Sequence, residues 1–173
     1  IMTTDTVAKT VERESAGWRI GGMAKGAGML APGLATMLVV LTTDAVLSPE
    51  AADAALRQVT KRSFDRLDTD GCMSTNDTVV LLASGASGVT PDAEAFAAEL
   101  LAACADLTGP LHRDAEGAGH DATIPVAGAA TEAEAVDVAR APGRPNLLTA
   151  APSGADPTSR RVLPPLRPPP AVL

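Results

Sequence analysis

The pair Ala35-Thr36 is the part of the sequence best suited to covalent chemistry. It follows Pro32-Gly33 and precedes the apolar run Met37 to Leu41. A threonine hydroxyl becomes a nucleophile when a base takes its proton, and the α-amino group of the same residue is such a base once it is a chain terminus. An α-amine has an ordinary pKa of about 7.7 to 8.0, close to working pH. Cleavage between Ala35 and Thr36 would create this catalyst; the alternative is a structural threonine that opens a buried strand.

Other motifs lack the pattern that their chemistry requires. DRLDTDG has the outline of a calcium loop, but Arg66, a cation, would stand at the first ligand position. GGMAKGAGM matches neither phosphate-loop pattern, and His112 and His120 are isolated. Cys72 and Cys104 are too few for a disulfide framework or a structural zinc site. We therefore expect no metal site, and reduced thiols as in the cytoplasm.

Charge and composition exclude several classes of partner. The formal net charge is -7, and the aromatic residues are Trp18, Phe64 and Phe96. Nucleic acids and anionic membranes require clustered Lys and Arg, and single strands also require stacking aromatics. The apolar runs are shorter than the ~20 residues of a membrane helix, and no signal peptide opens the chain. We expect neither nucleic acid nor membrane as a partner.

Predicted strands and helices, which must position these residues, alternate along the chain. A residue that caps a helix precedes each of three helical patterns, with Ser48, Thr90 and Thr131 as the expected caps. Strands are expected at 18–22, 36–43, 78–83 and 122–127. This order predicts an α/β or α+β fold, a layered sandwich in which helices cover the sheets.

The C-terminal region differs in composition from the rest. Residues 140–173 contain 9 of the 14 prolines and carry a local charge of +4. Proline at this density breaks helices and removes the donors of a sheet ladder. We expect a disordered or extended tail over 140–173, preceded by segments 1–35 and 36–139 on either side of the proposed cleavage point.

Four separated words in the sequence resemble the ornithine acetyltransferase family. They are TTDT at 3–6, GGMAKGAGMLAPGLATMLVVLTTDA at 21–45, DTDGCMSTNDTV at 68–79 and DAEGA at 114–118. Their order and spacing agree over roughly residues 1 to 140. The family, also called glutamate N-acetyltransferase, transfers an acetyl group from N-acetylornithine to glutamate in arginine biosynthesis. Its fold is superficially like that of N-terminal-nucleophile hydrolases.

The resemblance implies a role for each matching residue. The chain would cleave itself between Ala35 and Thr36, and Thr36 would accept the acetyl group in a ping-pong cycle. Thr3, Lys25 and Glu116 would contact the substrate together with Thr36. The resemblance implies no bound cofactor, although some members also use acetyl-CoA as a co-substrate. It further implies that the α and β chains of one precursor assemble as α2β2.

The sequence also departs from the family pattern. The family has a Thr-Gly oxyanion pair upstream of the TTDT word, and this sequence, which starts at Ile1, does not include that pair. Thr158 to Arg160 stand where the family has Asn-Trp-Gly. These departures predict a truncated internal fragment with an altered tail. Losing one oxyanion donor costs ~10² to 10³ in rate, so we expect a poor catalyst. Two alternatives remain open: a non-catalytic fragment or structural domain, and a related N-terminal-nucleophile amidase or aminopeptidase.

Overall fold

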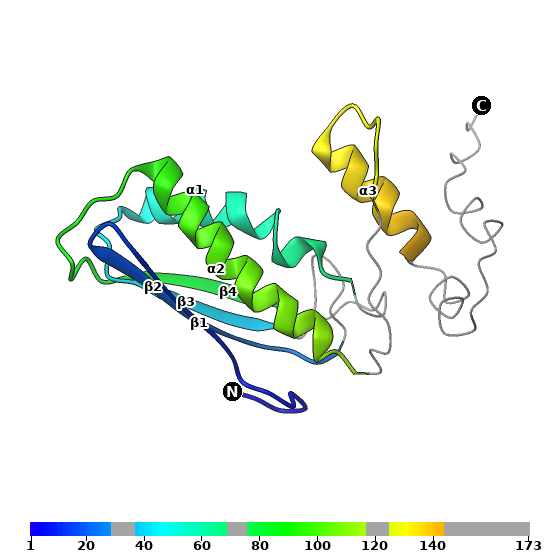
Figure 1. The fold of residues 1–173 in the computed structure, drawn as a ribbon, viewed down its shortest axis with the longest axis horizontal. Helices are drawn as coiled ribbons and strands as arrows, with labels where there is room; N and C mark the ends of the chain where they lie inside the picture. Colours follow the sequence, from blue (N-terminus) through cyan, green and yellow to red (C-terminus); the bar gives the residue numbers. More distant parts are fainter. Residues whose placement is uncertain (29–36, 69–75, 117–124, 144–173) are drawn as a thin grey trace. The chain divides into compact units, whose positions relative to one another are not determined.

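A computed structural model describes residues 1–28, 37–68, 76–116 and 125–143 of the chain. The chain divides into two compact units, residues 1–118 and 119–173. Unit 1 contains a four-stranded sheet and the helices that cover it, whereas α3 is the helix of unit 2 that the structure describes (Figure 1). The mixed α/β fold predicted from the sequence is thus confirmed.

The sheet has the order β1-β2-β3-β4. The pairs β1–β2 and β2–β3 are antiparallel, while β4 runs parallel to β3. A parallel neighbour requires a crossover connection, and α1 lies in the segment between β3 and β4. The strands are β1 (Lys9–Ser15), β2 (Trp18–Lys25), β3 (Leu38–Thr43) and β4 (Thr78–Ala83).

The strand β1 is one that the sequence patterns did not predict. Its residues KTVERES include four charged side chains, so it lacks the apolar run used to find the other strands. It pairs with β2 across a two-residue turn, with Ser15 opposite Trp18. Gly17 in that turn has a φ of +85°, which glycine adopts without steric cost. The strand therefore depends on its turn and its partner rather than on its own composition.

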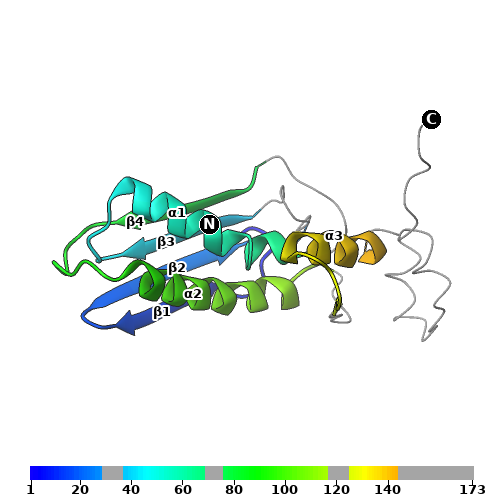
Figure 2. The same ribbon diagram turned by 90° about the horizontal axis from the view of Figure 1, so that it is seen from above.

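Two long helices cover one face of the sheet in unit 1. Figure 2 shows α1 (Pro49–Thr60) and α2 (Ala93–Arg113) side by side over the strands. Ser48 caps α1 as predicted, because its side chain accepts a hydrogen bond from the Ala51 N–H at 3.2 Å. The short 3-10 helix η1 (Phe64–Arg66) follows α1.

The predicted cap of the second helix was wrong. Asp92, not Thr90, caps α2, because the Asp92 carboxylate accepts the N–H groups of Glu94 at 2.9 Å and Ala95 at 3.1 Å. A carboxylate also interacts favourably with the positive end of the helix dipole, which a neutral hydroxyl does not.

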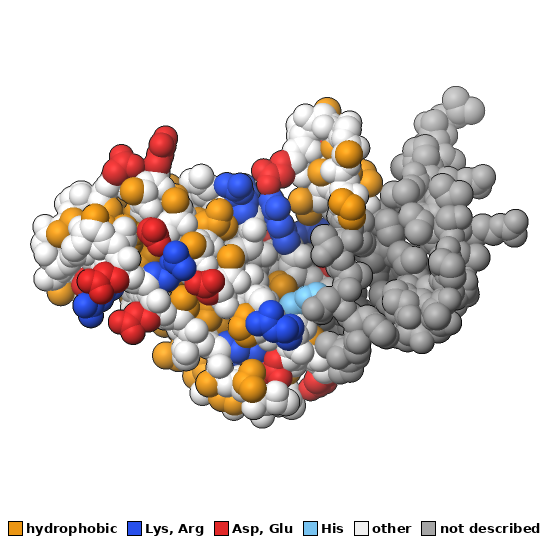
Figure 3. All heavy atoms as spheres, in the orientation of Figure 1, with side chains coloured by type: hydrophobic (Ala, Val, Ile, Leu, Met, Phe, Trp, Pro, Cys, Tyr) orange, Lys and Arg blue, Asp and Glu red, His pale blue; other side chains and the backbone are white. Residues whose placement is uncertain are grey.

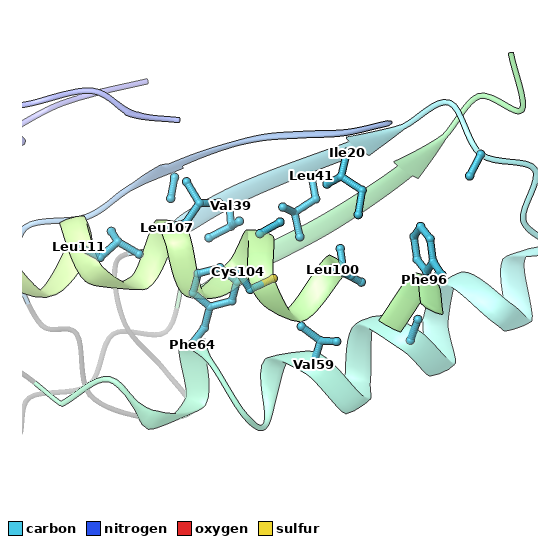
Figure 4. Close-up of a cluster of buried hydrophobic side chains, with 14 of the residues drawn as sticks. Ile20, Val39, Leu41, Val59, Phe64, Phe96, Leu100, Cys104, Leu107 and Leu111 are labelled. Atoms are coloured by element: carbon cyan, nitrogen blue, oxygen red, sulfur yellow. The ribbon is translucent and has the colours of Figure 1, made fainter. Parts of the chain in front are cut away.

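The core of unit 1 lies between the helices and the sheet. The helix α2 packs against β1 and β2, and its residues Leu100, Cys104 and Leu107 belong to one buried cluster with side chains of β2 and β3 (Figure 4). The Trp18 and Phe96 rings are 5.3 Å apart. Residues that alternate with the core positions lie on the opposite sheet face, where Met23 and Leu82 are exposed.

The described part of unit 2 consists mainly of α3 (Glu132–Gly143). Thr131 caps it as predicted, since its hydroxyl accepts the Glu134 N–H at 3.2 Å. The strand predicted at 122–127 is wrong for residues 125–127, which are not in a strand; residues 122–124 lie outside the described residues. The helix ends at Gly143, and the predicted tail beyond it also lies outside the described residues.

Candidate functional site

Among the described residues, Thr3, Lys25 and Glu116 belong to segments that meet at one end of the sheet. Lys25 is the last residue of β2 and lies opposite Leu38, the first residue of β3. Its side chain is buried, with the residue 7% exposed. Within the described residues, the Lys25 ammonium makes neither a hydrogen bond nor an ion pair. An ammonium at the end of a largely buried side chain can bind an anionic ligand.

Glu116 lies beside the loop that follows Lys25. The Glu116 N–H donates to the Ala27 carbonyl oxygen at 2.5 Å. The carboxylate lies close to Gly28, where a Cβ atom would stand 3.4 Å from Oε2. The residue is exposed and lies three positions beyond Arg113, the last residue of α2. A carboxylate and an ammonium therefore flank the same short loop.

Thr3 belongs to an N-terminal segment that is joined to this loop. Its N–H donates to Asp5 Oδ2 at 3.4 Å, and its side chain is exposed. The other oxygen of Asp5, Oδ1, accepts the Gly26 N–H at 2.8 Å. Because Gly26 directly follows Lys25, Asp5 connects the segment of Thr3 to the end of β2.

The proposed cleavage pair, Ala35 and Thr36, lies outside the described residues. Met37, the next residue along the chain, is buried. Its N–H donates to Asp77 Oδ1 at 2.9 Å, and its carbonyl oxygen accepts the Thr78 N–H at 3.0 Å. The backbone at the start of β3 is therefore fixed by residues that precede and open β4.

Three charged residues at this end were not selected from the sequence. Lys9 lies between Asp5 and Asp114, with Nζ 2.7 Å from Asp5 Oδ1 and in contact with Asp114 Oδ2. Asp114 also accepts hydrogen bonds from the Thr6 N–H and hydroxyl. Asp5 and Asp114 belong to the TTDT and DAEGA words, which signalled them as part of the motifs. No local pattern signals Lys9.

These contacts shift the pKa values of the three groups. Hydrogen bonds from Lys9 and then Thr6 lower the pKa of Asp114 to about 2. Burial opposes ionisation of Asp5, but bonds from Gly26, Lys9 and Thr3 outweigh it and lower its pKa. Burial likewise acts to lower the pKa of Lys9, but hydrogen bonds to Asp114 and Asp5 raise it overall. All three groups are ionised at neutral pH.

The arrangement suits a small ligand that carries both charges. The Lys25 ammonium can bind a carboxylate and the Glu116 carboxylate can bind an amine, as an amino acid requires. Within the described ranges, no group of three or more His, Cys, Asp or Glu residues could hold a metal ion. No described helix is long and apolar enough to cross a membrane.

Two other surface features do not involve the selected residues. A hollow of about 410 Å³ lies at the opposite end of the sheet, between Arg19, Asp44 and Ser84. Acidic and basic side chains are interspersed on the face that Figure 3 presents. The hollow lies at the start of β2, whereas Lys25 ends that strand.

Known proteins match this chain along most of its length. The model of the ArgJ family matches residues 1–165. The chain is 62% identical over 163 residues to the arginine biosynthesis bifunctional protein ArgJ of Streptomyces avermitilis, covering 94% of this chain and 43% of that protein. It is 56% identical over 164 residues to the protein of that name from Mycobacterium leprae, covering 94% and 40% respectively. The chain thus spans less than half the length of these relatives.

A solved structure supports the same relationship. The crystal structure of arginine biosynthesis bifunctional protein ArgJ from Bacillus halodurans matches with a TM-score of 0.60 and 33% sequence identity. The match covers 72% of this chain and 61% of that chain.

Proposed function

Since the chain belongs to the ArgJ family, we propose that it carries part of an acetyl-transfer site of arginine biosynthesis with Thr36 as the nucleophile. The relatives bear the name of bifunctional arginine biosynthesis proteins. The acetyl donor is N-acetylornithine and the acceptor is glutamate. The proposal extends to acetyl-CoA as a second donor and to α2β2 assembly of the cleaved chains.

The first step creates the nucleophile. The Thr36 hydroxyl oxygen attacks the Ala35 carbonyl carbon, the peptide C–N bond breaks, and the Thr36 nitrogen takes a proton. Water then hydrolyses the resulting ester, which leaves a carboxylate on Ala35 and a free α-amine on Thr36. That amine has an ordinary pKa of about 7.7 to 8.0, so it accepts a proton near neutral pH.

Acetyl transfer then takes two half-reactions at one site. The Thr36 oxygen attacks the acetyl carbonyl of N-acetylornithine while the α-amine takes the hydroxyl proton. The amide C–N bond breaks, and that proton passes to the departing ornithine amine. The amine of glutamate next attacks the acetyl ester and releases N-acetylglutamate, and a proton returns to the Thr36 oxygen.

Lys25, Glu116 and Thr3 have roles that fit the substrates. The Lys25 ammonium binds a carboxylate of the amino acid, and Glu116 binds its free amine. Thr3 is a hydrogen-bond partner through its hydroxyl. Burial of the Lys25 residue supports this role, because water screens a charge less in such a position than on an open surface.

The observation that carries the proposal is the meeting of the four sequence words at one end of the sheet. Asp5 of the first word bonds to Gly26 of the second. Asp77 of the third word holds Met37, the neighbour of Thr36. Glu116 of the fourth word bonds to Ala27. Segments far apart in sequence thus support one small region, as a shared substrate site requires.

Mass spectrometry of the denatured chain tests the proposal. We expect two pieces, residues 1–35 and 36–173, and incubation with N-acetylornithine should add the mass of one acetyl group to the peptide that begins with Thr36. Thr36→Ala should abolish both changes. Thr42→Ala is the matched control, because Thr42 is an exposed threonine of the adjacent strand β3. One intact species that stays unacetylated on long incubation would contradict the proposal.

The same incubation distinguishes the alternatives. Addition of glutamate to the acetylated chain should yield N-acetylglutamate and restore the unmodified mass. Release of acetate without any need for glutamate would indicate an amidase. A non-catalytic fragment would produce neither product.

A further inference from the structure

A buried ion cluster joins the segments of the candidate site. It consists of Lys9 and the carboxylates of Asp5 and Asp114, and we refer to it as the Lys9 clamp. The Lys9 side chain has no exposed surface, and those of Asp5 and Asp114 are 1% and 7% exposed. Lys9 is the first residue of β1, whereas Asp114 directly follows α2. The clamp therefore connects the first strand to the end of the second long helix.

Each arm of the clamp ends beside a proposed substrate contact. Asp5 holds the Gly26 N–H, and Gly26 directly follows Lys25. Asp114 is two residues before Glu116. A shift of either carboxylate would therefore be transmitted through one or two residues to Lys25 or Glu116.

Burying the three charged groups of the clamp costs free energy unless they stay in contact with one another. Taking charges out of water carries a desolvation cost, and apolar residues of similar volume often give equal or greater stability. Two carboxylates share one ammonium, and N–H groups of Gly26 and Thr6 supply further donors. Only one arrangement of the three groups is favourable, because any displacement separates a buried charge from its partner. Compared with apolar side chains of similar volume, the cluster therefore gains a fixed register of the segments it joins rather than extra stability.

We propose that Asp5, Lys9 and Asp114 are positioning residues that hold Lys25 and Glu116 at the separation needed to bind one amino-acid substrate. This inference rests on the proposed function for the identity of the substrate. The clamp would fix the loop at Gly26 and the segment at Glu116 whether or not a ligand is bound.

Arg13 provides a matched control on the same two elements. It lies four residues after Lys9 along β1 and forms ion pairs with Glu99 at 3.0 Å and Asp106 at 2.9 Å, both on α2. Its side chain is 33% exposed. Arg13→Met therefore also removes ion pairs between β1 and α2, but away from Gly26 and Glu116.

Amide hydrogen exchange tests the geometric claim. Lys9→Met should speed exchange at the Gly26 and Glu116 amides by about tenfold or more, relative to amides of β3, because it leaves two buried carboxylates unpaired. Arg13→Met should leave both amides unchanged. If Lys9→Met fails to fold, Asp114→Asn replaces it, since asparagine keeps the shape and removes the charge. Unchanged exchange at both amides in the folded variant would overturn the proposal.

Calorimetric titration with N-acetylornithine tests the consequence for binding. Lys9→Met or Asp114→Asn should weaken the affinity by about tenfold or more, whereas Arg13→Met should bind as the unaltered chain does. Equal affinity of the clamp variants and the unaltered chain would overturn the positioning role. Failure of the unaltered chain to bind would instead count against the proposed function, and the exchange experiment would still decide whether the clamp fixes the two segments.

Discussion

Acid should destabilise the chain through Asp114. The carboxylate accepts hydrogen bonds from Lys9 and Thr6 in the folded chain, which lowers its pKa from 3.8 to about 2. In the unfolded chain these partners are lost and the pKa returns to its ordinary value. Since one pKa unit corresponds to about 1.4 kcal/mol, Asp114 contributes about 2 kcal/mol to the free energy of unfolding at neutral pH. The side chain is 7% exposed, but its hydrogen bonds to Thr6 lie at the surface, so solvent screens part of this contribution.

The sign of the effect follows from proton binding. Between about pH 4 and pH 2 the unfolded chain binds more protons at Asp114 than the folded chain does, so the free energy of unfolding falls as the pH falls. The contribution is fully present above about pH 4. Asp5, whose pKa is also lowered, adds a loss of the same sign.

Urea unfolding at a series of pH values measures this loss. The fluorescence of Trp18, the only tryptophan and a buried one, reports the unfolding of the core. Asp114→Asn should be less stable at neutral pH and should lose about 2 kcal/mol less than the unaltered chain as the pH falls to about 2. An identical acid loss in both proteins would refute the assignment of this stability to Asp114.

Three further predictions concern the core. Phe96→Ala should lower the free energy of unfolding by about 3 to 5 kcal/mol in urea, whereas Leu82→Ala, at an exposed position, should change it by about 0.5 kcal/mol or less. Gly22→Ala should cost about 1 to 3 kcal/mol in the same assay, because its Cβ would lie 2.8 Å from Leu41 Cδ2. Burial raises the pKa of the Cys104 thiol to about 12, so peptide mapping after thiol alkylation at neutral pH should show label at Cys104 only once the chain is unfolded.

The sequence predicted the elements whose signals are local. The α1 helix has a serine cap, a proline at its first position and an apolar stripe, all within one segment. The strand β4 occupies the predicted residues 78–83 because TVVLLA combines β-branched and apolar side chains without interruption. In both cases the residues that specify the element are contained in it.

Elements that depend on distant partners were harder to predict. The strand β1 carries charged residues because Lys9 pairs with buried carboxylates and Arg13 pairs with α2. Val11 is the apolar residue between them on the same face of the strand, so β1 contains no apolar run in the sequence. The helix α2 begins after Asp92 rather than Thr90, a choice that depends on which side chain reaches the first free N–H groups.

The candidate site shows the same division. Thr3, Lys25 and Glu116 were selected through family words, and the structure brings their segments to one end of the sheet. Lys9 was missed because its ion-pair partner Asp114 lies far along the chain. Spacing within a motif carries no information about such a partner.

The separation between Lys9 and Asp114 has a consequence for synthesis of the protein. The two residues are 105 positions apart. At ordinary translation rates, Asp114 is added about 5 to 20 s after Lys9. The antiparallel strands β1, β2 and β3, which need only residues 9–43, can pair during this interval. A nascent chain that stalls before Asp114 can therefore pair its first three strands but cannot complete the ion cluster at the start of β1.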